Sequence, residues 1–234
     1  MEKELRLDKL LSDSGRWSRK EAKQLLKQGR VQVDGAVERA PDRKVRPGDT
    51  RVTVDGQPVE WAEFHYIMMN KPAGVLTATE DRRQKTVVDL LPPEYRNLFP
   101  VGRLDKDTQG LLLLTDDGEL AHRLLSPRHH VDKVYLAEID GEVDGADVAA
   151  FEAGMTLGDG TQCQPAGLES LGPGRCLVTL REGKFHQVKR MLAQRGKPVL
   201  RLKRLSMGNL RLDEALKPGE FRLLTVQEVQ MLGK

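Results

Sequence analysis

The sequence has few of the features that build disulfide scaffolds, metal sites or membrane spans. Its 234 residues contain two cysteines, Cys163 and Cys176, with neither a CxxC pair nor a paired histidine motif nearby. A disulfide scaffold and a zinc site are therefore excluded, and we expect two reduced thiols and no metal. No apolar run approaches the roughly 18 residues of a membrane span, and the charged opening residues do not form a signal peptide. These absences predict a cytoplasmic protein with no membrane partner.

Charge is abundant but nearly balanced, since charged residues make up 31% of the chain and the net charge is +3. Residues 1–46 hold 13 Lys or Arg against 8 Asp or Glu, so the positive charge is concentrated at the N-terminus. A local basic excess is typical of segments that contact nucleic acid, whereas the net charge alone is weak evidence.

A short basic helix is predicted over residues 19–28. Ser18 and Glu21 have the spacing of a capping box, and Gly29 ends the segment. The apolar side chains of this helix fall on one side and the cationic side chains on the other. These cations, with those just beyond each end, are Arg16, Arg19, Lys20, Lys23, Lys27 and Arg30. A charge run is often only a solvated helix face, but the near absence of interleaved acids favours phosphate binding.

A tight hairpin follows this helix, because VQVDGAV alternates and Asp34-Gly35 supplies the turn. The stretch RLDKLLSDSGRWSRKEAKQLLKQGRVQVDG resembles the S4 RNA-binding domain, and the resemblance covers roughly residues 4–56. Its RLDKLL, SRKEA and GRVQVDG blocks stand in the order of that family. The resemblance implies that the helix and hairpin grip structured RNA, which identifies a partner but no reaction. We predict an S4 domain at residues 1–60 and a second domain at residues 61–234.

The most informative segment is residues 101–127, VGRLDKDTQGLLLLTDDGELAHRLLSP. Its loop, residues 102–110, contains Asp105 and Asp107, and the four leucines that follow are typical of a buried strand. Residues 118–125 suit a short helix. A carboxylate beside a strand is held rigidly, as a reactive group requires.

Two other roles fit these acids. In the first, the loop binds calcium, because its polar residues match positions 1, 3, 5, 6 and 12 of an EF-hand-like loop. Those residues are Asp105, Asp107, Gln109, Gly110 and Asp116. Position 12 is Asp where a bidentate Glu is usual, and the leucine run favours a strand, so calcium is disfavoured. In the second, the acids cap a turn and pair with Arg103 or Lys106. Spacing alone does not separate this role from a catalytic one.

The segment GRLDKDTQGLLLLTDDG closely resembles the signature of the pseudouridine synthases of the RsuA and RluA type. Further blocks stand in that family's order: NKPAGVLTAT at 70–79, KVYLAEI at 133–139 and EGKFHQVKRML at 182–192. The resemblance covers essentially the whole chain. It implies an enzyme that isomerises uridine in RNA to pseudouridine. Because that reaction involves no net redox change, no cofactor is expected.

The resemblance also implies roles for three residues. Asp105 is the nucleophile, Lys189 is its ion-pair partner, and Tyr135 stacks on the base and accepts a proton. From the residues alone, a tyrosine in an alternating strand is more often a packing residue, and Lys189 on an amphipathic helix would face solvent. We interpret His186 as a surface or packing residue and not as catalytic.

A uridine inside folded RNA must be flipped out before it reacts. Arg103 is the candidate for filling the gap or holding the neighbouring phosphates. Weaker candidates for RNA contacts are Asn70, Lys71, Arg128, His129, His130 and Arg190.

The pattern of apolar runs predicts an α+β fold with a mixed, mainly antiparallel sheet after the S4 domain. Strand-like runs lie at 66–69, 111–114, 134–139, 176–180 and 199–202, and further helices are expected at 144–154, 184–195 and 225–232.

The blocks SPRHHVDKVYL, FHQVKRM and LKPGEFRLLT are most similar to the RsuA-type enzymes, which act on small-subunit ribosomal RNA. The expected partner is therefore 16S ribosomal RNA within an assembling small subunit, and a monomer is expected. Two alternatives stay open: a 23S ribosomal RNA synthase of the same family, and a non-catalytic RNA-binding or ribosome-assembly protein. The presence of Asp105, Tyr135 and Lys189 together argues against the second.

Overall fold

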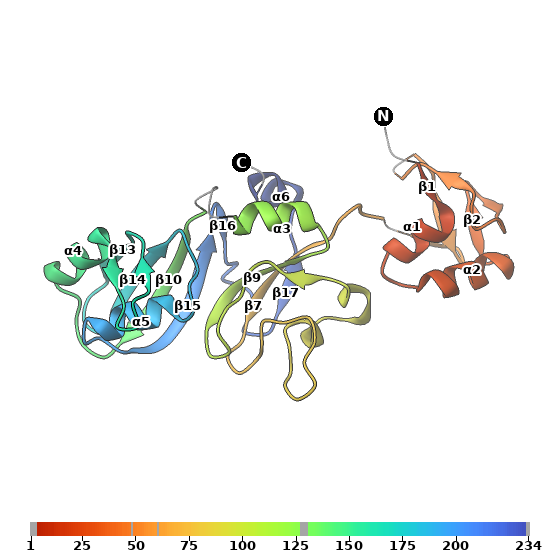
Figure 1. Cartoon of the computed structure of the whole chain (residues 1–234). Coiled ribbons are helices and arrows are strands. Elements are labelled where there is room, and N and C mark those ends of the chain that lie inside the picture. The colour runs from red at the N-terminus through yellow and green to blue at the C-terminus, as the bar shows by residue number, and fades with distance from the viewer. Residues whose placement is uncertain (1–3, 48, 60, 127–130, 233–234) are drawn as a thin grey trace. The chain divides into compact units, whose positions relative to one another are not determined.

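The computed structural model describes residues 4–47, 49–59, 61–126 and 131–232. The chain forms two compact units, Met1–Phe64 with Leu91–Asn97, and His65–Leu90 with Leu98–Lys234 (Figure 1). The sequence pattern places one boundary near residue 60, whereas the structure also groups the distant segment 91–97 with the N-terminal residues. No helix among the described residues is long and apolar enough to cross a membrane.

The first unit combines short strands with two α-helices. Its elements are β1 (Leu5–Arg6), α1 (Leu7–Asp13), α2 (Arg19–Lys27), β2 (Val31–Val33), β3 (Ala36–Val37), β4 (Lys44–Val45), β5 (Val52–Val54), β6 (Gln57–Pro58) and the short 3₁₀ helix η2 (Pro93–Tyr95). The strands form a β1–β4 pair and a sheet in the order β3-β2-β5-β6. Leucines of α1 and α2 pack with valines of β2, β4 and β5 in one apolar core.

The helix cap and the hairpin turn predicted from the sequence of this unit are both present in the structure. The Ser18 hydroxyl accepts the Glu21 N–H at 3.3 Å, and the Glu21 carboxylate accepts the Ser18 N–H at 2.7 Å, so the predicted capping box is confirmed. Asp34 and Gly35 both have positive φ, 52° and 85°, which the predicted two-residue hairpin requires.

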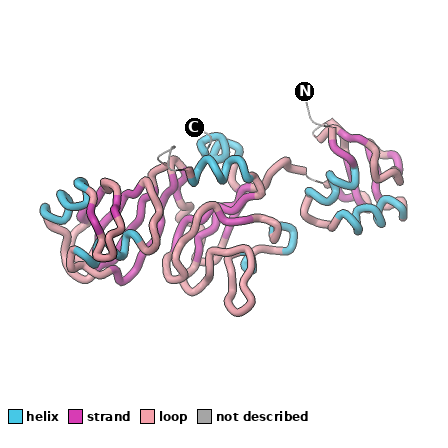
Figure 2. Tube along the Cα trace, viewed as in Figure 1, coloured by secondary structure: helices cyan, strands magenta, loops and turns pink. Residues whose placement is uncertain are grey.

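The second unit is built on one large sheet (Figure 2). Its elements are β7 (Tyr66–Lys71), η1 (Val88–Leu90), β8 (Phe99–Pro100), β9 (Gln109–Thr115), α3 (Gly118–Leu125), β10 (Lys133–Ile139), α4 (Gly145–Ala153), β11 (Met155–Thr156), β12 (Gln162–Cys163), β13 (Gly167–Ser170), β14 (Arg175–Leu180), α5 (Gln187–Gln194), β15 (Val199–Met207), β16 (Leu210–Arg211), β17 (Phe221–Leu223) and α6 (Val226–Leu232). The sheet order is β13-β14-β10-β15-β9-β7-β17, with β16 beside β15 and β8 beside β9. All of these pairings are antiparallel except β15–β9. The predicted α+β fold with a mixed, mainly antiparallel sheet is confirmed.

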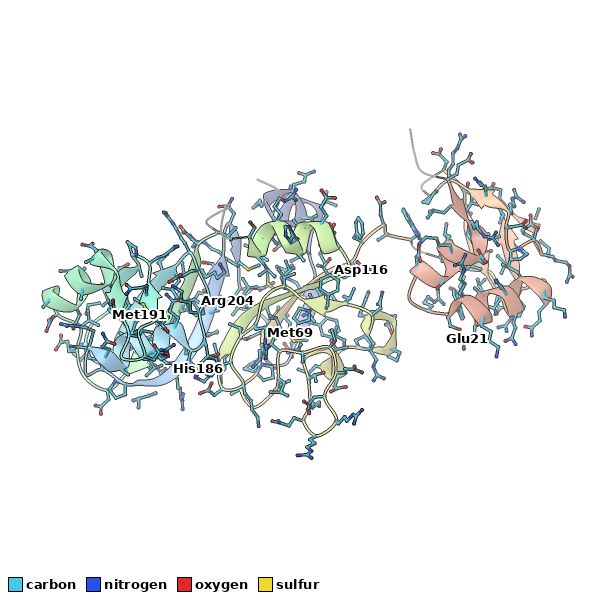
Figure 3. All side chains as sticks on the ribbon, in the orientation of Figure 1. Glu21, Met69, Asp116, His186, Met191 and Arg204 are labelled. Carbon is cyan, nitrogen blue, oxygen red and sulfur yellow. The ribbon has the colours of Figure 1, made fainter. Side chains whose placement is uncertain are left out.

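The parallel join between β9 and β15 is narrow. It consists of the pairs Lys203–Gln109 and Arg204–Gly110. Gly110 has φ +102°, and a Cβ there would lie 2.2 Å from the Arg204 carbonyl oxygen, so this position has no room for a side chain. The buried Arg204 (Figure 3) also ties the strands through a 2.8 Å bond from Nε to the Leu111 carbonyl. The join brings the loop before β9 alongside β10 and β15.

Helices cover the two halves of this sheet separately. Apolar residues of α3 and α6 pack with Met68 of β7 and with Leu111 and Leu113 of β9, and the leucine run of β9 is buried as predicted (Figure 1). On the other half α4 packs against β13, and α5 lies beside β15. The structure begins α5 at Gln187, three residues after the predicted start, because the preceding residues form a loop.

Candidate active site

The loop between β8 and β9 is held in place by a buried lysine. Lys71 is fully buried, and its ammonium donates hydrogen bonds to the main-chain carbonyls of Pro72 (3.0 Å), Asp105 (3.1 Å), Lys106 (3.2 Å) and Thr108 (3.0 Å). Burial lowers the pKa of Lys71 to about 8, against the opposing carboxylates of Asp107 and Asp105. The loop that presents Asp105 is therefore built around a buried cation.

A second anchor fixes the same loop from the segment that follows β7. The Thr77 hydroxyl donates to the Leu104 carbonyl at 2.8 Å and accepts the Leu104 N–H at 3.2 Å. The Gly74 N–H donates to the Lys106 carbonyl at 2.8 Å. The NKPAGVLTAT segment thus forms the support on which the Asp105 loop rests.

These contacts correct two of the predicted RNA contacts. Lys71 and Asn70 are 0% and 3% exposed, and the Asn70 amide donates to the Leu216 carbonyl at 2.7 Å. Neither side chain is available to a phosphate. The sequence does contain one indication of this burial. Asn70 and Lys71 end the strand YIMMNK, directly after the apolar residues Ile67, Met68 and Met69.

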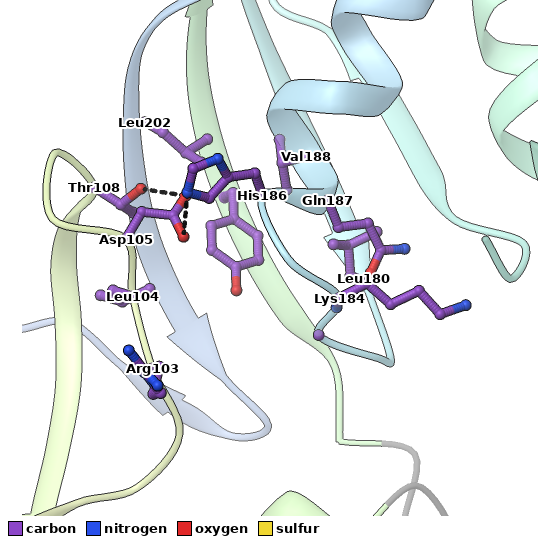
Figure 4. A pocket seen from close by; sticks show the side chains of 12 residues that line it. Arg103, Leu104, Asp105, Thr108, Leu180, Lys184, His186, Gln187, Val188 and Leu202 are labelled. Atoms are coloured by element: carbon purple, nitrogen blue, oxygen red, sulfur yellow. Dashed lines mark hydrogen bonds and ion pairs between the residues drawn. The ribbon is translucent and has the colours of Figure 1, made fainter. Parts of the chain in front are cut away.

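The Asp105 carboxylate faces two basic side chains from the start of α5. Lys189 Nζ lies 3.0 Å from Asp105 Oδ2. His186 Nε2 lies 3.6 Å from Oδ1, a contact that can be followed in Figure 4. The Thr108 hydroxyl lies 3.5 Å from Oδ2. The structure therefore brings the predicted pair Asp105 and Lys189 together, and it adds His186, which the sequence interpretation set aside.

Lys189 bridges two carboxylates of the same loop, since its Nζ also lies 2.5 Å from Asp107 Oδ1. Burial of Lys189 opposes its charge, but the hydrogen bonds to Asp107 and Asp105 outweigh burial and raise the pKa of the ammonium. Asp105 and Asp107 therefore pair with Lys189, which is distant in sequence. The neighbouring Lys106, which was an alternative partner, donates instead to the Gln84 side chain at 2.7 Å. Within the described ranges no group of three or more His, Cys, Asp or Glu side chains could hold a metal ion.

A pocket opens beside the Asp105 carboxylate. Its lining combines Asp105 and Arg103 from the loop, Tyr135 from β10 and His186 from the α5 start, with apolar walls that include Leu180, Val188 and Leu202 (Figure 4). Tyr135 is 8% exposed, and it pairs with Arg204 and Val178 on the neighbouring strands. A carboxylate, a cation and an aromatic ring between apolar walls suit a planar base with an attached sugar.

Hydrogen bonds fix the loop before α5. The Gln187 side chain accepts the Lys184 N–H at 3.0 Å and donates to the Glu182 carboxylate at 2.6 Å. His186 takes the left-handed conformation, φ 49°, which is uncommon for a residue with a side chain. This turn directs the His186 ring toward Asp105 (Figure 4).

The other predicted RNA contacts differ in their surroundings. Arg103 is exposed at the pocket, whereas Arg190 is partly buried and lies 2.5 Å from Asp159 Oδ1. Arg128, His129 and His130 lie outside the described residues.

The predicted cationic face of the first unit is exposed, as a phosphate-binding surface requires. Its members are Arg16, Arg19, Lys20, Lys23, Lys27 and Arg30. The fully buried Asp8 carboxylate lies 3.5 Å from Arg19 and 4.0 Å from Lys23, and Arg30 pairs with Asp55 at 2.5 Å.

Comparison with known proteins identifies the family. A family model described as RNA pseudouridylate synthase matches residues 65–194. The chain belongs to this family. A model described as S4 domain matches residues 5–50. The resemblances seen in the sequence are confirmed, and so is the enzyme class, an isomerase of uridine in RNA.

Relatives of this synthase match it along almost its whole length. It is 50% identical to an uncharacterized RNA pseudouridine synthase of Bacillus subtilis, over 98% of this chain and 99% of that protein. It is 41% identical to the ribosomal small subunit pseudouridine synthase A of Vibrio cholerae, over 98% of this chain and 100% of that protein. A crystal structure of a pseudouridylate synthase matches with a TM-score of 0.69 and 35% identity, over 97% of this chain and 99% of that one.

Proposed function

We propose that this synthase converts a uridine of 16S ribosomal RNA to pseudouridine, with Asp105 as the nucleophile. The observation that carries the catalytic role is the position of the Asp105 carboxylate in the pocket, 3.0 Å from the Lys189 ammonium. The 16S target is supported by the 41% identity to the small-subunit synthase of Vibrio cholerae.

The reaction sets clear demands on the site. The N1–C1′ bond of the uridine breaks, the uracil turns, and C5 bonds to C1′. The proton on C5 then leaves and N1 takes up a proton, so the product is an isomer of the substrate. The Asp105 carboxylate acts on the sugar, either by attacking C1′ or by promoting a glycal intermediate, and both routes need it ionised. The Lys189 ammonium pairs with this carboxylate and orients it.

The remaining side chains of the pocket supply binding and proton transfer. Tyr135 provides a ring for the uracil to stack on and a phenol oxygen that accepts the C5 proton. Arg103 is exposed at the pocket, where its guanidinium holds phosphates or fills the gap that the flipped uridine leaves. The apolar walls exclude water from the sugar while its bond to uracil is broken.

Tritium release from uridine C5 tests this function, because each turnover frees one C5 proton. Labelled 16S ribosomal RNA is presented naked and in partly assembled small subunits, and labelled 23S ribosomal RNA is presented beside it. We expect release from a 16S form with the wild-type enzyme, and a loss of at least about 1,000-fold with Asp105→Asn, as for removal of a nucleophile. The matched control is Asp140→Asn, because Asp140 is an exposed carboxylate that does not line the pocket.

Each result of this assay bears on one part of the proposal. Release from 23S RNA alone would move the target to the large subunit. Equal release by Asp105→Asn and wild type would reject Asp105 as the nucleophile. Absence of release from both RNAs, with RNA affinity retained, would favour the alternative of a non-catalytic ribosome-assembly protein.

A further inference from the structure

A second hollow includes Phe185, from the loop that leads into α5, in its lining. It has a volume of about 520 Å³, within the roughly 300–1,000 Å³ of small-molecule sites. Its lining combines Leu157 and Asp159 with Arg190 and Ala193 of α5 and with Phe185. Phe185 and His186 are consecutive, yet His186 lines the pocket of Asp105 and Phe185 lines this hollow.

Phe185 is an aromatic ring that the fold leaves in solvent. It is 75% exposed, whereas the other phenylalanines of the chain are at most 39% exposed. Its ring stacks on the His186 imidazole with a centroid distance of 3.8 Å and an interplanar angle of 17°. Its carbonyl accepts a hydrogen bond from Arg190 at 3.3 Å. The ring therefore rests on His186, the main chain at Phe185 is held by Arg190, and most of the Phe185 surface stays open to a planar partner.

We propose that this hollow binds the base of a nucleotide next to the target uridine, stacked on Phe185. The inference rests on the proposed function, because it extends the same RNA strand from the catalytic pocket into the adjacent hollow. The Phe185–His186 stack connects the two sites, so adjacent nucleotides can occupy them without a gap. The occupant is an unpaired nucleobase of the substrate RNA.

The chemistry of the hollow matches a nucleobase. Aromatic rings bind unpaired bases by stacking, which is tolerant of base identity. The ion pair of Arg190 and Asp159, 2.5 Å apart, places a donor and an acceptor at the edge of the hollow, where they can meet the polar edge of a base. Flipping the uridine also unstacks its neighbour, and the Phe185 ring replaces the lost stacking partner.

The test compares Phe185→Ala, Phe185→Leu and Phe185→Tyr in the full-length enzyme. The assay is C5 tritium release from the ribosomal RNA that the wild type modifies. Loss of one base–aromatic stack predicts an increase in KM of about tenfold for Phe185→Ala, with kcat within about threefold of wild type because Asp105 and Lys189 are untouched. Phe185→Leu keeps an apolar side chain without a ring face and should match Phe185→Ala, whereas Phe185→Tyr should match wild type.

Controls separate this role from structural effects. Leu200→Ala removes another exposed apolar side chain, 68% exposed and outside both hollows, and should leave KM unchanged. A fall in kcat without a rise in KM would mean that Phe185 acts through His186, and it would overturn the proposal. Wild-type KM in Phe185→Leu would overturn it as well, because an apolar contact without stacking would then suffice.

A binding measurement keeps this inference distinct from the proposed function. Phe185→Trp introduces an indole whose fluorescence, taken as the difference from wild type, should be quenched by ribosomal RNA when a base stacks on it. If the wild type turns over 16S RNA and this signal is unchanged, the hollow does not hold a base and the function stands. If neither 16S nor 23S RNA is modified, the proposed function fails, and quenching by those RNAs still decides whether the hollow binds a base.

Discussion

The Lys71 ammonium lies 3.1 Å from the main-chain carbonyl oxygen of Asp105. The side chain of the same Asp105 accepts the Lys189 ammonium at 3.0 Å. Two lysines therefore act on one residue, one by holding its backbone from the interior and the other by facing its carboxylate in the pocket. The first holds the main chain that carries the carboxylate, and the second pairs with the carboxylate itself.

Replacing Lys71 by Met should disrupt the Asp105 loop. The variant removes the Lys71 donor from four main-chain carbonyls, of which those of Lys106 and Asp105 keep a main-chain N–H donor. We therefore expect a loss of about 2–4 kcal/mol in the free energy of unfolding. Activity should fall by about 100-fold, because a displacement of about 1 Å in a catalytic group has that effect. Urea unfolding and tritium release measure the two effects. The matched control, Lys106→Met, removes an exposed lysine of the same loop, and equal behaviour of the two variants would contradict the role of Lys71.

The sequence predicts the elements whose causes are local. The capping box at Ser18 and Glu21, the turn at Asp34-Gly35 and the leucine run of β9 each depend on residues a few positions apart. The same holds for the short helix α3, which the structure places at the predicted residues Gly118–Leu125. Such signals are complete within one segment, so sequence spacing is enough to read them.

The sequence does not predict features that depend on distant segments. Lys71 is buried because carbonyls from a loop more than 30 positions away accept its hydrogen bonds. The residues next to Lys71 in the sequence show only that a proline follows it, and they do not indicate this contact. The contact of His186 with Asp105 depends on a left-handed turn that shortens the predicted helix. Gly110 is predicted as the end of a loop, while its role in joining two strands becomes visible only with Arg204 beside it. For Asp105 and Lys189 the family resemblance supplied the pairing that periodicity alone left open.

The cationic face of α2 makes a prediction about salt. Lys20 and Lys27 are exposed on this helix, and each contact with a phosphate contributes about 0.7–0.9 to the slope of log affinity against log salt. The double variant Lys20→Ala with Lys27→Ala should therefore reduce the magnitude of this slope for ribosomal RNA binding by about 1.5, so that affinity depends less on salt. Salt titration of RNA affinity measures this slope. The variant with arginine at both positions keeps the charge and should keep the slope, and an unchanged slope in the alanine variant would exclude these lysines as phosphate contacts.

Asp147 links α4 to the segment that ends α5, the helix that carries Lys189. Its carboxylate is fully buried and lies 2.8 Å from Arg195 and 2.6 Å from Lys197. Burial opposes its ionisation, but hydrogen bonds from Lys197, the Asp144 N–H and Arg195 outweigh burial and lower the pKa of Asp147 to about 2. The stabilisation from this lowered pKa is present above about pH 4 and is lost as pH falls through about 2.

Asp147→Asn should accordingly lower the free energy of unfolding at pH 7 by about 2–4 kcal/mol, because two cations lose a buried partner. The difference in free energy of unfolding between wild type and variant should become smaller at low pH, by about 1 kcal/mol at pH 3. The reason is that the wild type progressively loses the stabilisation from the ionised Asp147 carboxylate as pH falls. Urea unfolding of both proteins between pH 7 and pH 3 measures this difference, with Asp140→Asn as an exposed control. A difference that stays constant over this range would show that ionisation of Asp147 does not stabilise the fold. The anchor on the far end of α5 would then depend on packing instead of charge.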